Sequence, residues 1–194
     1  MRHIEIMDTT LRDGEQTSGV SFSASEKLTI AQLLLTELKV DRIEIASARV
    51  SEGEFQAVKK ITSWASKAGF LDRVEVLTFV DGGTSVQWML DAGATVMNLL
   101  TKGSLNHLEH QLKKTPEQHF DEIQATIELA NAKGLSVNVY LEDWSNGMKN
   151  SPEYVFQFLD FLTQQPVKRI LLPDTFGVLI PSETATFIAE TKKR

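Results

Sequence analysis

The segment from Asp8 to Gln16 carries the residues best suited to chemistry. It reads Asp-Thr-Thr-Leu-Arg-Asp-Gly-Glu-Gln and places Arg12 beside Asp13, directly after a run, Ile4–Asp8, that the sequence predicts as a buried strand. Charged groups there are costly unless they are paired or bound to a metal. One interpretation is a cap and salt-bridge cluster that opens the first helix. The other is a hard metal ion on Asp13 with the Arg12 guanidinium beside it, which would stabilise negative charge developing on a carbonyl oxygen.

Polar residues also follow the other strand-like runs. They are Ser47 and Arg49, Asp81, Lys102, Glu142 and Asp143, and Asp174 and Thr175. A (β/α)8 barrel gathers such positions around one mouth, where barrel enzymes carry out their chemistry, whereas an open doubly wound sheet spreads them along an edge. The first strand runs into Thr9–Glu15, which has no Gly-rich phosphate fingerprint of the open fold. The pattern therefore favours the barrel.

The elements that must position these residues alternate regularly. Short β-branched or Leu-rich runs are each followed by a longer stretch with helical spacing. The expected strands are Ile4–Asp8, Arg42–Ala46, Val74–Phe79, Thr95–Leu100, Ser136–Leu141 and Lys168–Leu172, and the expected helices lie near residues 24–39, 52–68, 84–92, 116–133, 152–164 and 181–193. Such apolar strands suit a parallel sheet covered on both faces.

The repeat length agrees with a barrel. Six βα units in 194 residues average about 32 residues, against about 31 in a complete barrel of roughly 250. We therefore expect an α/β fold: a (β/α)8 TIM barrel present as about six units, with the last two missing, so that residues 1–194 form part of one catalytic barrel domain. The first and sixth strands would then have unpaired edges.

Local signals mark the helix ends. Ser23 and Ser25 precede the first helix, and Thr115-Pro116, Ser151-Pro152 and Pro181 place proline near the start of three others. Proline is tolerated there because its missing N–H has no helical partner. Gly134 follows the fourth helix as an expected C-terminal cap.

Composition excludes several classes of protein. The chain has no cysteine and a net charge of −6, without a basic stripe for nucleic acid or a polybasic segment for a membrane surface. Its apolar runs are too short to span a membrane, and Glu5 and Asp8 interrupt the place of a signal-peptide core. We expect a soluble, cytoplasmic protein.

The segment Asp8–Gln16 resembles the signature of the metallolyase family with an Asp-Arg-Glu barrel motif (the DRE-type TIM-barrel metallolyases). This family includes 2-isopropylmalate, homocitrate and citramalate synthases and 3-hydroxy-3-methylglutaryl-CoA lyase. The similarity covers essentially the whole chain. Three further stretches, Ile45–Ser51, Leu99–Ser104 and Val139–Gly147, are most similar to bacterial citramalate synthase, and the likeness ends with Leu172–Gly177.

The resemblance implies a role for several residues. Asp13 would bind a divalent metal (Mn²⁺, Mg²⁺ or Zn²⁺), and Arg12 would hold the keto oxygen and stabilise the alkoxide. Glu142 would serve in proton transfer with the methyl group of acetyl-CoA. The remaining assignments are Thr175 on the carboxylate of a 2-oxo acid, Leu77, Leu100 and Tyr140 around its side chain, and Glu15 and Glu44 behind the metal site.

Each residue also has a simpler interpretation. Glu142 and Asp143 could be exposed loop acids, and Thr175 could belong to a turn or cap. Lys102, beside Gly103, could bind a phosphate or carboxylate, although a solvated loop lysine is the simpler interpretation. The three apolar residues could be plain barrel core: Leu77, Leu100 and Tyr140.

The histidines do not complete a metal site. In the resembled family the other protein ligands are a His-x-His pair on the seventh strand, and the chain has only His3, His107, His110 and His119. We interpret His107 and His110 as solvated surface in the loop after the fourth strand. The His-x-His pair is expected beyond residue 194, so the chain by itself would bind metal poorly.

The resemblance implies an acyltransferase that condenses acetyl-CoA with a small 2-oxo acid to give a 2-alkylmalate. Pyruvate, giving citramalate for isoleucine synthesis, is the first expectation because the three pocket residues are bulky. The alternatives are 2-isopropylmalate synthase acting on 2-oxoisovalerate for leucine synthesis, a carbon–carbon lyase of the same family, and an inactive fragment. A homodimer is expected for the full-length protein.

Overall fold

The computed structural model describes residues 4–193. The chain forms two compact units, one up to Asn98 and one from Leu99 onward. The strands follow one another in the order β1-β2-β3-β4-β5-β6. None of the helices within the described residues combines the length and apolar character needed to cross a membrane.

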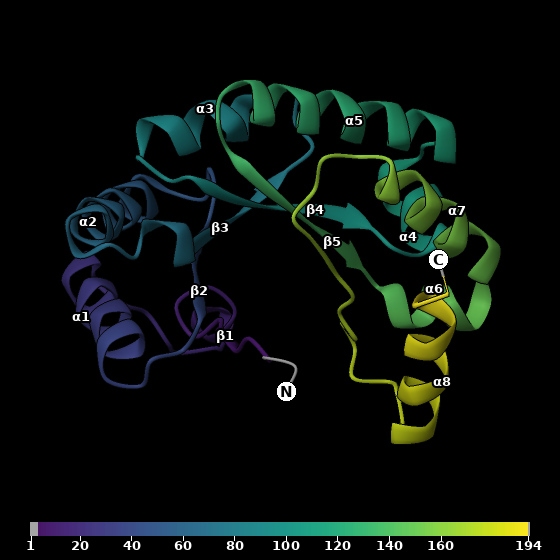
Figure 1. Ribbon diagram of the computed structural model, residues 1–194, viewed down its shortest axis with the longest axis horizontal. Coiled ribbons are helices and arrows are strands. Elements are labelled where there is room, and N and C mark those ends of the chain that lie inside the picture. Colours follow the sequence, from purple (N-terminus) through teal and green to yellow (C-terminus); the bar gives the residue numbers. More distant parts are fainter. Residues whose placement is uncertain (1–3, 194) are drawn as a thin grey trace. The chain divides into compact units, whose positions relative to one another are not determined.

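The first unit alternates short strands with helices (Figure 1). Its elements are β1 (Met7–Asp8), the 3-10 turn η1 (Gly14–Gln16), α1 (Ala24–Thr36), β2 (Arg42–Ser47), α2 (Glu52–Ala68), the 3-10 turn η2 (Leu71–Arg73), β3 (Val74–Phe79), α3 (Thr84–Asp91) and the start of β4 (Val96–Lys102). Strands β1, β2 and β3 are parallel, with Asp8 opposite Ile43 and Glu44 opposite Glu75. Helices α1 and α2 pack against each other and against β2.

Helix α2 shows how the sequence builds this unit. Ser51 caps its N-terminus by accepting a hydrogen bond from the Glu54 N–H, and Gly69 ends it with a φ of 77°, a conformation that costs glycine little. Between these ends the buried residues fall at helical spacing: Ala57, Val58, Ile61 and Ala65. This apolar stripe faces the buried residues of β2, so that the helix covers the strand.

The second unit contains the end of β4 and the remaining elements. These are α4 (Leu105–His107), the π-helical turn η3 (Leu108–Leu112), α5 (Pro116–Ala132), β5 (Ser136–Glu142), α6 (Trp144–Asn150), α7 (Pro152–Thr163), β6 (Arg169–Leu171) and α8 (Pro181–Thr191). Strands β5 and β6 are parallel, with Asn138 opposite Arg169. An aromatic cluster joins α5 to α7: the ring of Phe120 lies 5.1 Å from Phe158 and 4.9 Å from Phe161 between centroids.

The expected elements are confirmed, with differences at their ends. Strand β1 has only two residues, and Ile4 and Ile6 are 81% and 61% exposed, so the expectation of a buried first strand is wrong. Strand β6 is likewise short and only partly buried. Both strands lie at the ends of the sheet order, and very short edge strands are one way in which proteins limit pairing with other chains.

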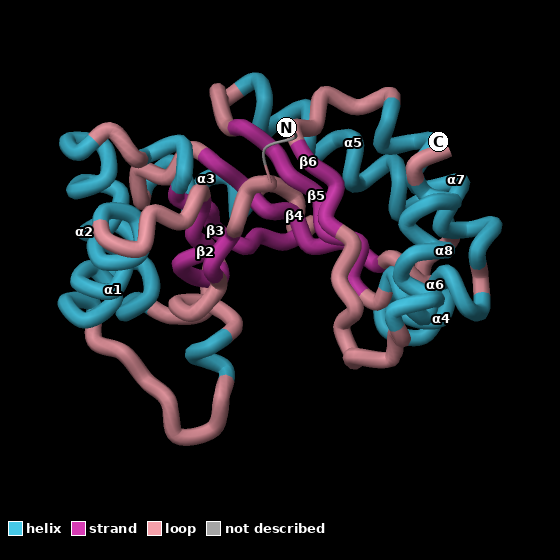
Figure 2. Tube along the Cα trace, turned by 60° about the horizontal axis from the view of Figure 1, so that its bottom comes forward, coloured by secondary structure: helices cyan, strands magenta, loops and turns pink. Residues whose placement is uncertain are grey.

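Sequence periodicity missed the short helices α4 and α6 and the π-turn. Figure 2 shows these segments as helix where the sequence suggested only loops. They contain three to seven residues, too few for a clear 3.6-residue repeat. The sequence signals for the first residues of the longer helices were confirmed. Ser23 and Thr115 each form a capping box, and Pro116, Pro152 and Pro181 lie in the first turns of their helices.

Candidate active site

In the first unit, the segment from Thr9 to Gly14, which contains Arg12, forms a tight turn after β1. The N–H groups of Arg12, Asp13 and Gly14 all donate to the carbonyl of Thr9, at 3.1, 2.8 and 3.2 Å. Leu11 is 1% exposed and anchors the turn in the core. The turn therefore fixes the backbone on both sides of Arg12. The first helix begins only at Ala24 with Ser23 as its cap, so the segment does not open that helix.

Two carboxylates hold the Arg12 guanidinium. Its Nε donates to Glu44 Oε2 at 2.5 Å and its Nη1 to Asp13 Oδ1 at 2.8 Å. The two partners differ strongly in burial, since the Glu44 side chain is 0% exposed and that of Asp13 is 62% exposed. A guanidinium donates in a rigid fork, so two fixed acceptors also fix its direction.

Glu44 is held in turn by Asn98, whose Nδ2 donates to Glu44 Oε1 at 2.6 Å. Burial raises the pKa of Glu44, and the nearby Arg12 charge and the Asn98 hydrogen bond offset this only in part. The structure therefore places Glu44, a buried residue of β2, in direct contact with Arg12.

Glu15 belongs to a polar network behind the turn that contains Arg12. It accepts from the Phe22 N–H at 2.9 Å and from Lys27 Nζ at 2.5 Å. Lys27 is 1% exposed and also donates to Glu54 Oε1 at 2.6 Å and to the Leu11 carbonyl at 3.2 Å. Glu15 therefore reaches the Arg12 turn through Lys27. Sequence reasoning missed Lys27, although it lies four residues before buried Ala31 on the same helix face.

A cavity of about 280 Å³ opens beside Arg12 in the first unit. Its lining mixes charged, hydroxyl and apolar groups: Leu11, Arg12, Glu15, Gln16, Ser21, Ala46, Ser47, Val50, Ser51 and Glu54. The polar groups in this lining would fix the orientation of a small ligand. Arg12 therefore borders a space that a small ligand could occupy.

In the second unit, Glu142 ends β5 and forms an ion pair with Lys102 at the end of β4. The two side chains are 25% and 15% exposed, so both are largely withdrawn from water. The Gly103 N–H donates to the Glu142 carbonyl at 2.6 Å. The interpretation of Lys102 as a solvated loop lysine is therefore wrong, because it lies on a strand and pairs with the acid of the next strand.

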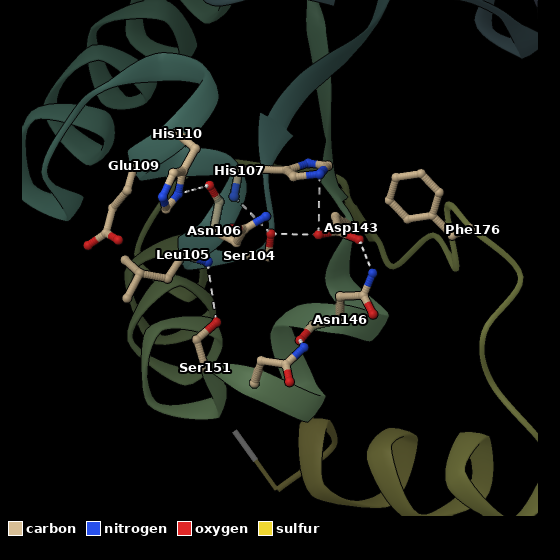
Figure 3. A pocket seen from close by; sticks show the side chains of 11 residues that line it. Ser104, Leu105, Asn106, His107, Glu109, His110, Asp143, Asn146, Ser151 and Phe176 are labelled. Atoms are coloured by element: carbon tan, nitrogen blue, oxygen red, sulfur yellow. Dashed lines mark hydrogen bonds and ion pairs between the residues drawn. The ribbon is translucent and has the colours of Figure 1, made fainter.

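Asp143 follows Glu142 and is almost completely buried, so it is not an exposed loop acid. Figure 3 shows its carboxylate meeting Ser104, His107 and Asn146. The Asp143 N–H donates to Thr175 Oγ1 at 2.9 Å, which gives the Thr175 hydroxyl a defined position after β6. Thr175 is itself exposed, and neighbouring Asp174 accepts from Ser145 Oγ at 2.7 Å, which lowers the pKa of Asp174.

His107 is the clearest correction among the histidines. It lies on α4 rather than in a solvated loop, is 7% exposed, and its Nε2 is 3.5 Å from Asp143 Oδ2. His110 is exposed, as expected. His119 is buried, and burial lowers its pKa to about 4. His3 lies outside the described residues.

The three expected pocket residues lie on consecutive strands. Leu77 on β3 and Tyr140 on β5 are 6% and 9% exposed, and Leu100 on β4 is partly buried. The first unit thus brings together Arg12, Asp13 and Glu44. The second unit places Thr175 next to Asp143, which directly follows Glu142 at the end of β5. The role of these residues as a single site stays a prediction.

Asp13 is the expected metal ligand with the most suitable chemistry. Its carboxylate is a hard oxygen donor, suited to Mg²⁺ or Mn²⁺, and its exposure leaves it accessible. Within residues 4–193 no three carboxylate, histidine or cysteine side chains gather into a set that could hold a metal ion. Asp13 stays the expected ligand of a divalent ion, and other ligands would have to complete such a site.

The chain is similar to several known proteins along almost its whole length. The model of the HMGL-like family matches residues 3–194. A probable 2-isopropylmalate synthase of Ignicoccus hospitalis is 32% identical over 181 residues, which are 93% of this chain and 43% of that protein. A putative (R)-citramalate synthase of Methanopyrus kandleri is 32% identical over 191 residues, covering 98% and 35%. A homocitrate synthase of the same organism is 35% identical over 188 residues, covering 97% and 45%.

The chain spans less than half the length of these relatives. Among solved structures, the hydroxymethylglutaryl-CoA lyase of Pseudomonas aeruginosa matches with a TM-score of 0.72 at 16% identity, covering 98% of this chain and 64% of that one. The HMG-CoA lyase of Brucella melitensis matches with a TM-score of 0.64 at 18% identity, covering 98% and 68%. These likenesses confirm the fold class expected from the sequence, a partial α/β barrel.

Proposed function

The chain belongs to the HMGL-like family, and from this premise we propose that it carries catalytic residues of an acyltransferase that condenses acetyl-CoA with a 2-oxo acid. The overall reaction consumes acetyl-CoA, the 2-oxo acid and water, and releases a 2-alkylmalate and CoA. The observation that supports it best is the arrangement around Arg12. Its guanidinium is held by buried Glu44 and exposed Asp13, and Arg12 is among the residues that line a cavity.

Arg12 would neutralise the charge that develops on the keto oxygen when its carbon is attacked. A preorganised donor of this kind contributes strongly because it need not reorganise during the reaction. Glu44 and Asp13 keep the guanidinium in one direction, at 2.5 and 2.8 Å. Asp13 would also hold a divalent ion (Mn²⁺, Mg²⁺ or Zn²⁺), which when bound supplies Lewis-acid polarisation of the keto group.

Glu142 would act as the base. It would take a proton from the methyl group of acetyl-CoA, and the enolate so formed would attack the keto carbon. Thr175 would donate its hydroxyl hydrogen to the carboxylate of the 2-oxo acid, since the hydroxyl oxygen already accepts from the Asp143 N–H. Hydrolysis of the thioester would complete the reaction.

We propose pyruvate as the 2-oxo acid. Bulky Leu77, Leu100 and Tyr140 would leave room for a methyl group but little more at the acid's side chain. The second candidate is 2-oxoisovalerate, which is favoured by the relatives named as 2-isopropylmalate synthases. A lyase that cleaves a carbon–carbon bond is the rival on the same scaffold.

The test measures CoA release by the full-length protein with acetyl-CoA, a divalent metal and each 2-oxo acid in turn. We expect a higher kcat/KM for pyruvate, and a strong preference for 2-oxoisovalerate would overturn the substrate assignment. Cleavage of acyl-CoA substrates without condensation would support the lyase instead. Asp13→Asn should weaken metal binding in a titration followed by calorimetry, whereas exposed Asp121→Asn on α5 is the matched control.

A further inference from the structure

Three loops at the strand ends of the second unit are clasped together around Asp143. The segment after β4 and helix α6 approach so closely that a Cβ on Gly147 would lie 2.1 Å from the Gly103 carbonyl oxygen. A Cβ on Gly103 would lie 2.6 Å from the carbonyl oxygen of Leu141. Glycine is therefore needed at both positions for these segments to meet.

Asp143 has an unusual backbone at the centre of this clasp. Its φ of 65° and ψ of 25° are left-handed, a region that most L-residues avoid and that glycine, asparagine and aspartate adopt more readily. Glycine and asparagine would both adopt this conformation without placing a charge in the interior. A buried aspartate at this position therefore calls for a function of the carboxylate itself.

The carboxylate gathers donors from both loops. Ser104 Oγ donates to Oδ2 at 2.7 Å, and Asn146 Nδ2 donates to Oδ1 at 2.7 Å. His107 Nε2 lies 3.5 Å from Oδ2 (Figure 3). Ser104 and His107 belong to the segment after β4, whereas Asn146 lies on α6 after β5. Both carboxylate oxygens are thus used to join the two segments.

Asp143 also contacts the third loop, which follows β6. The Asp143 N–H donates to Thr175 Oγ1 at 2.9 Å, and next to this contact Ser145 Oγ donates to Asp174 Oδ1 at 2.7 Å. Glu142 immediately precedes Asp143 in the chain. Asp143, with its left-handed backbone, therefore links Glu142 at the end of β5 to the Thr175 hydroxyl after β6.

We propose that Asp143 is a positioning residue, whose buried carboxylate locks the turn after β5 and thereby fixes the Glu142 carboxylate and the Thr175 hydroxyl relative to each other. Ser104 and His107 hold the Asp143 carboxylate in place. The effect on catalysis rests on the proposed function, since it assumes that Glu142 and Thr175 meet the substrate. The mechanical coupling between residue 143 and the loop of Thr175 does not depend on it.

Asp143→Gly separates the carboxylate from the backbone, because glycine keeps the left-handed conformation without strain. In the full-length protein we expect hydrogen–deuterium exchange to rise both in the turn after β5 and in residues 174–178. Asp121→Asn on α5 should leave both segments unchanged. Unchanged exchange in residues 174–178 of a folded Asp143→Gly variant would overturn the coupling, whether or not the protein has the proposed activity.

Kinetics test the catalytic part. Misplacement of reacting groups by about 1 Å can cost about 10²-fold in rate, so we expect kcat/KM of Asp143→Gly to fall by about that factor, with a higher KM for the 2-oxo acid. Asp143→Asn, which retains one oxygen acceptor, should recover part of the loss. Raised exchange with wild-type kcat and KM would overturn the positioning role. A wild-type protein inactive with every 2-oxo acid would instead overturn the proposed function, and the exchange measurement would still decide the coupling.

Discussion

Arg12 Nε lies 2.5 Å from Glu44 Oε2, so the one guanidinium of the signature segment is tied to a carboxylate that is completely buried on β2. Glu44 cannot relax toward water, and Asn98 holds its other oxygen. The pair therefore sets where Arg12 points. It also places an acid with a raised pKa in the core of the first unit.

Glu44→Gln should make the protein more stable relative to wild type as the pH rises from about 4.5, the ordinary pKa of the group. Because burial raises the pKa of Glu44 in the folded state, that state keeps a proton that the unfolded chain has already lost. Stability from this group is thus present below that pH and is lost as the pH rises toward the folded value. Chemical denaturation at a series of pH values measures the effect. Exposed Glu109→Gln is the control, and parallel pH profiles for Glu44→Gln and wild type would contradict it.

His119 should produce the opposite pH dependence. It is 1% exposed, accepts from the Lys102 N–H at 3.2 Å, and burial lowers its pKa from 6.5 to about 4. Between these values the unfolded chain binds a proton that the folded protein does not, so stability is present above pH 6.5 and lost as the pH falls toward 4. The contribution is roughly 3 kcal/mol. His119→Gln should make the free energy of unfolding less dependent on pH between about 4 and 6.5. An unchanged pH dependence in this variant would show that His119 titrates normally.

The sequence predicted most of the fold because local patterns determine it. The bounds of β3 and α2 agree with the expected ranges to the residue. The expected range of β1 was too long because Ile4 and Ile6 resemble core residues in the sequence. Both side chains are exposed in the structure, and nothing in the local pattern indicates that exposure. The order of the units predicted an edge position for this strand, but a short run of apolar residues does not show how far an edge strand is exposed.

The candidate site was predicted less completely, since its supporting contacts join distant segments. The motif identified Arg12 and Asp13, and Glu44 was found only through the resemblance. Lys27, Ser104 and His107 were missed as supports. A usable signal did exist for His107: Leu105, Leu108 and Leu112 recur at helical spacing after Ser104, which caps α4. The partner of His107, Asp143, is 36 positions later in the chain, beyond the reach of periodicity.

Lys27→Met should destabilise the first unit strongly. The substitution keeps the apolar stem but removes a buried ammonium that pairs with Glu15 at 2.5 Å and Glu54 at 2.6 Å. Removing one partner of a buried ion pair leaves uncompensated charge and costs about 3–5 kcal/mol. The free energy of unfolding measured in urea tests this. Lys60→Met on the exposed face of α2 is the matched control, and equal effects of the two substitutions would contradict a structural role for Lys27.

Gly147→Ala should destabilise the second unit by about 1–3 kcal/mol, the usual cost of overpacking. The added Cβ would lie 2.1 Å from the Gly103 carbonyl oxygen, a backbone atom that cannot rotate away. Gly53→Ala is the matched control because Gly53 is also helical and its added Cβ would meet Ser51 Oγ only at an ordinary 3.6 Å. That control should cause no loss and could gain up to about 1 kcal/mol from helix propensity. If thermal unfolding shows Gly147→Ala to be as stable as Gly53→Ala, the segment after β4 and helix α6 do not meet as closely as the structure places them.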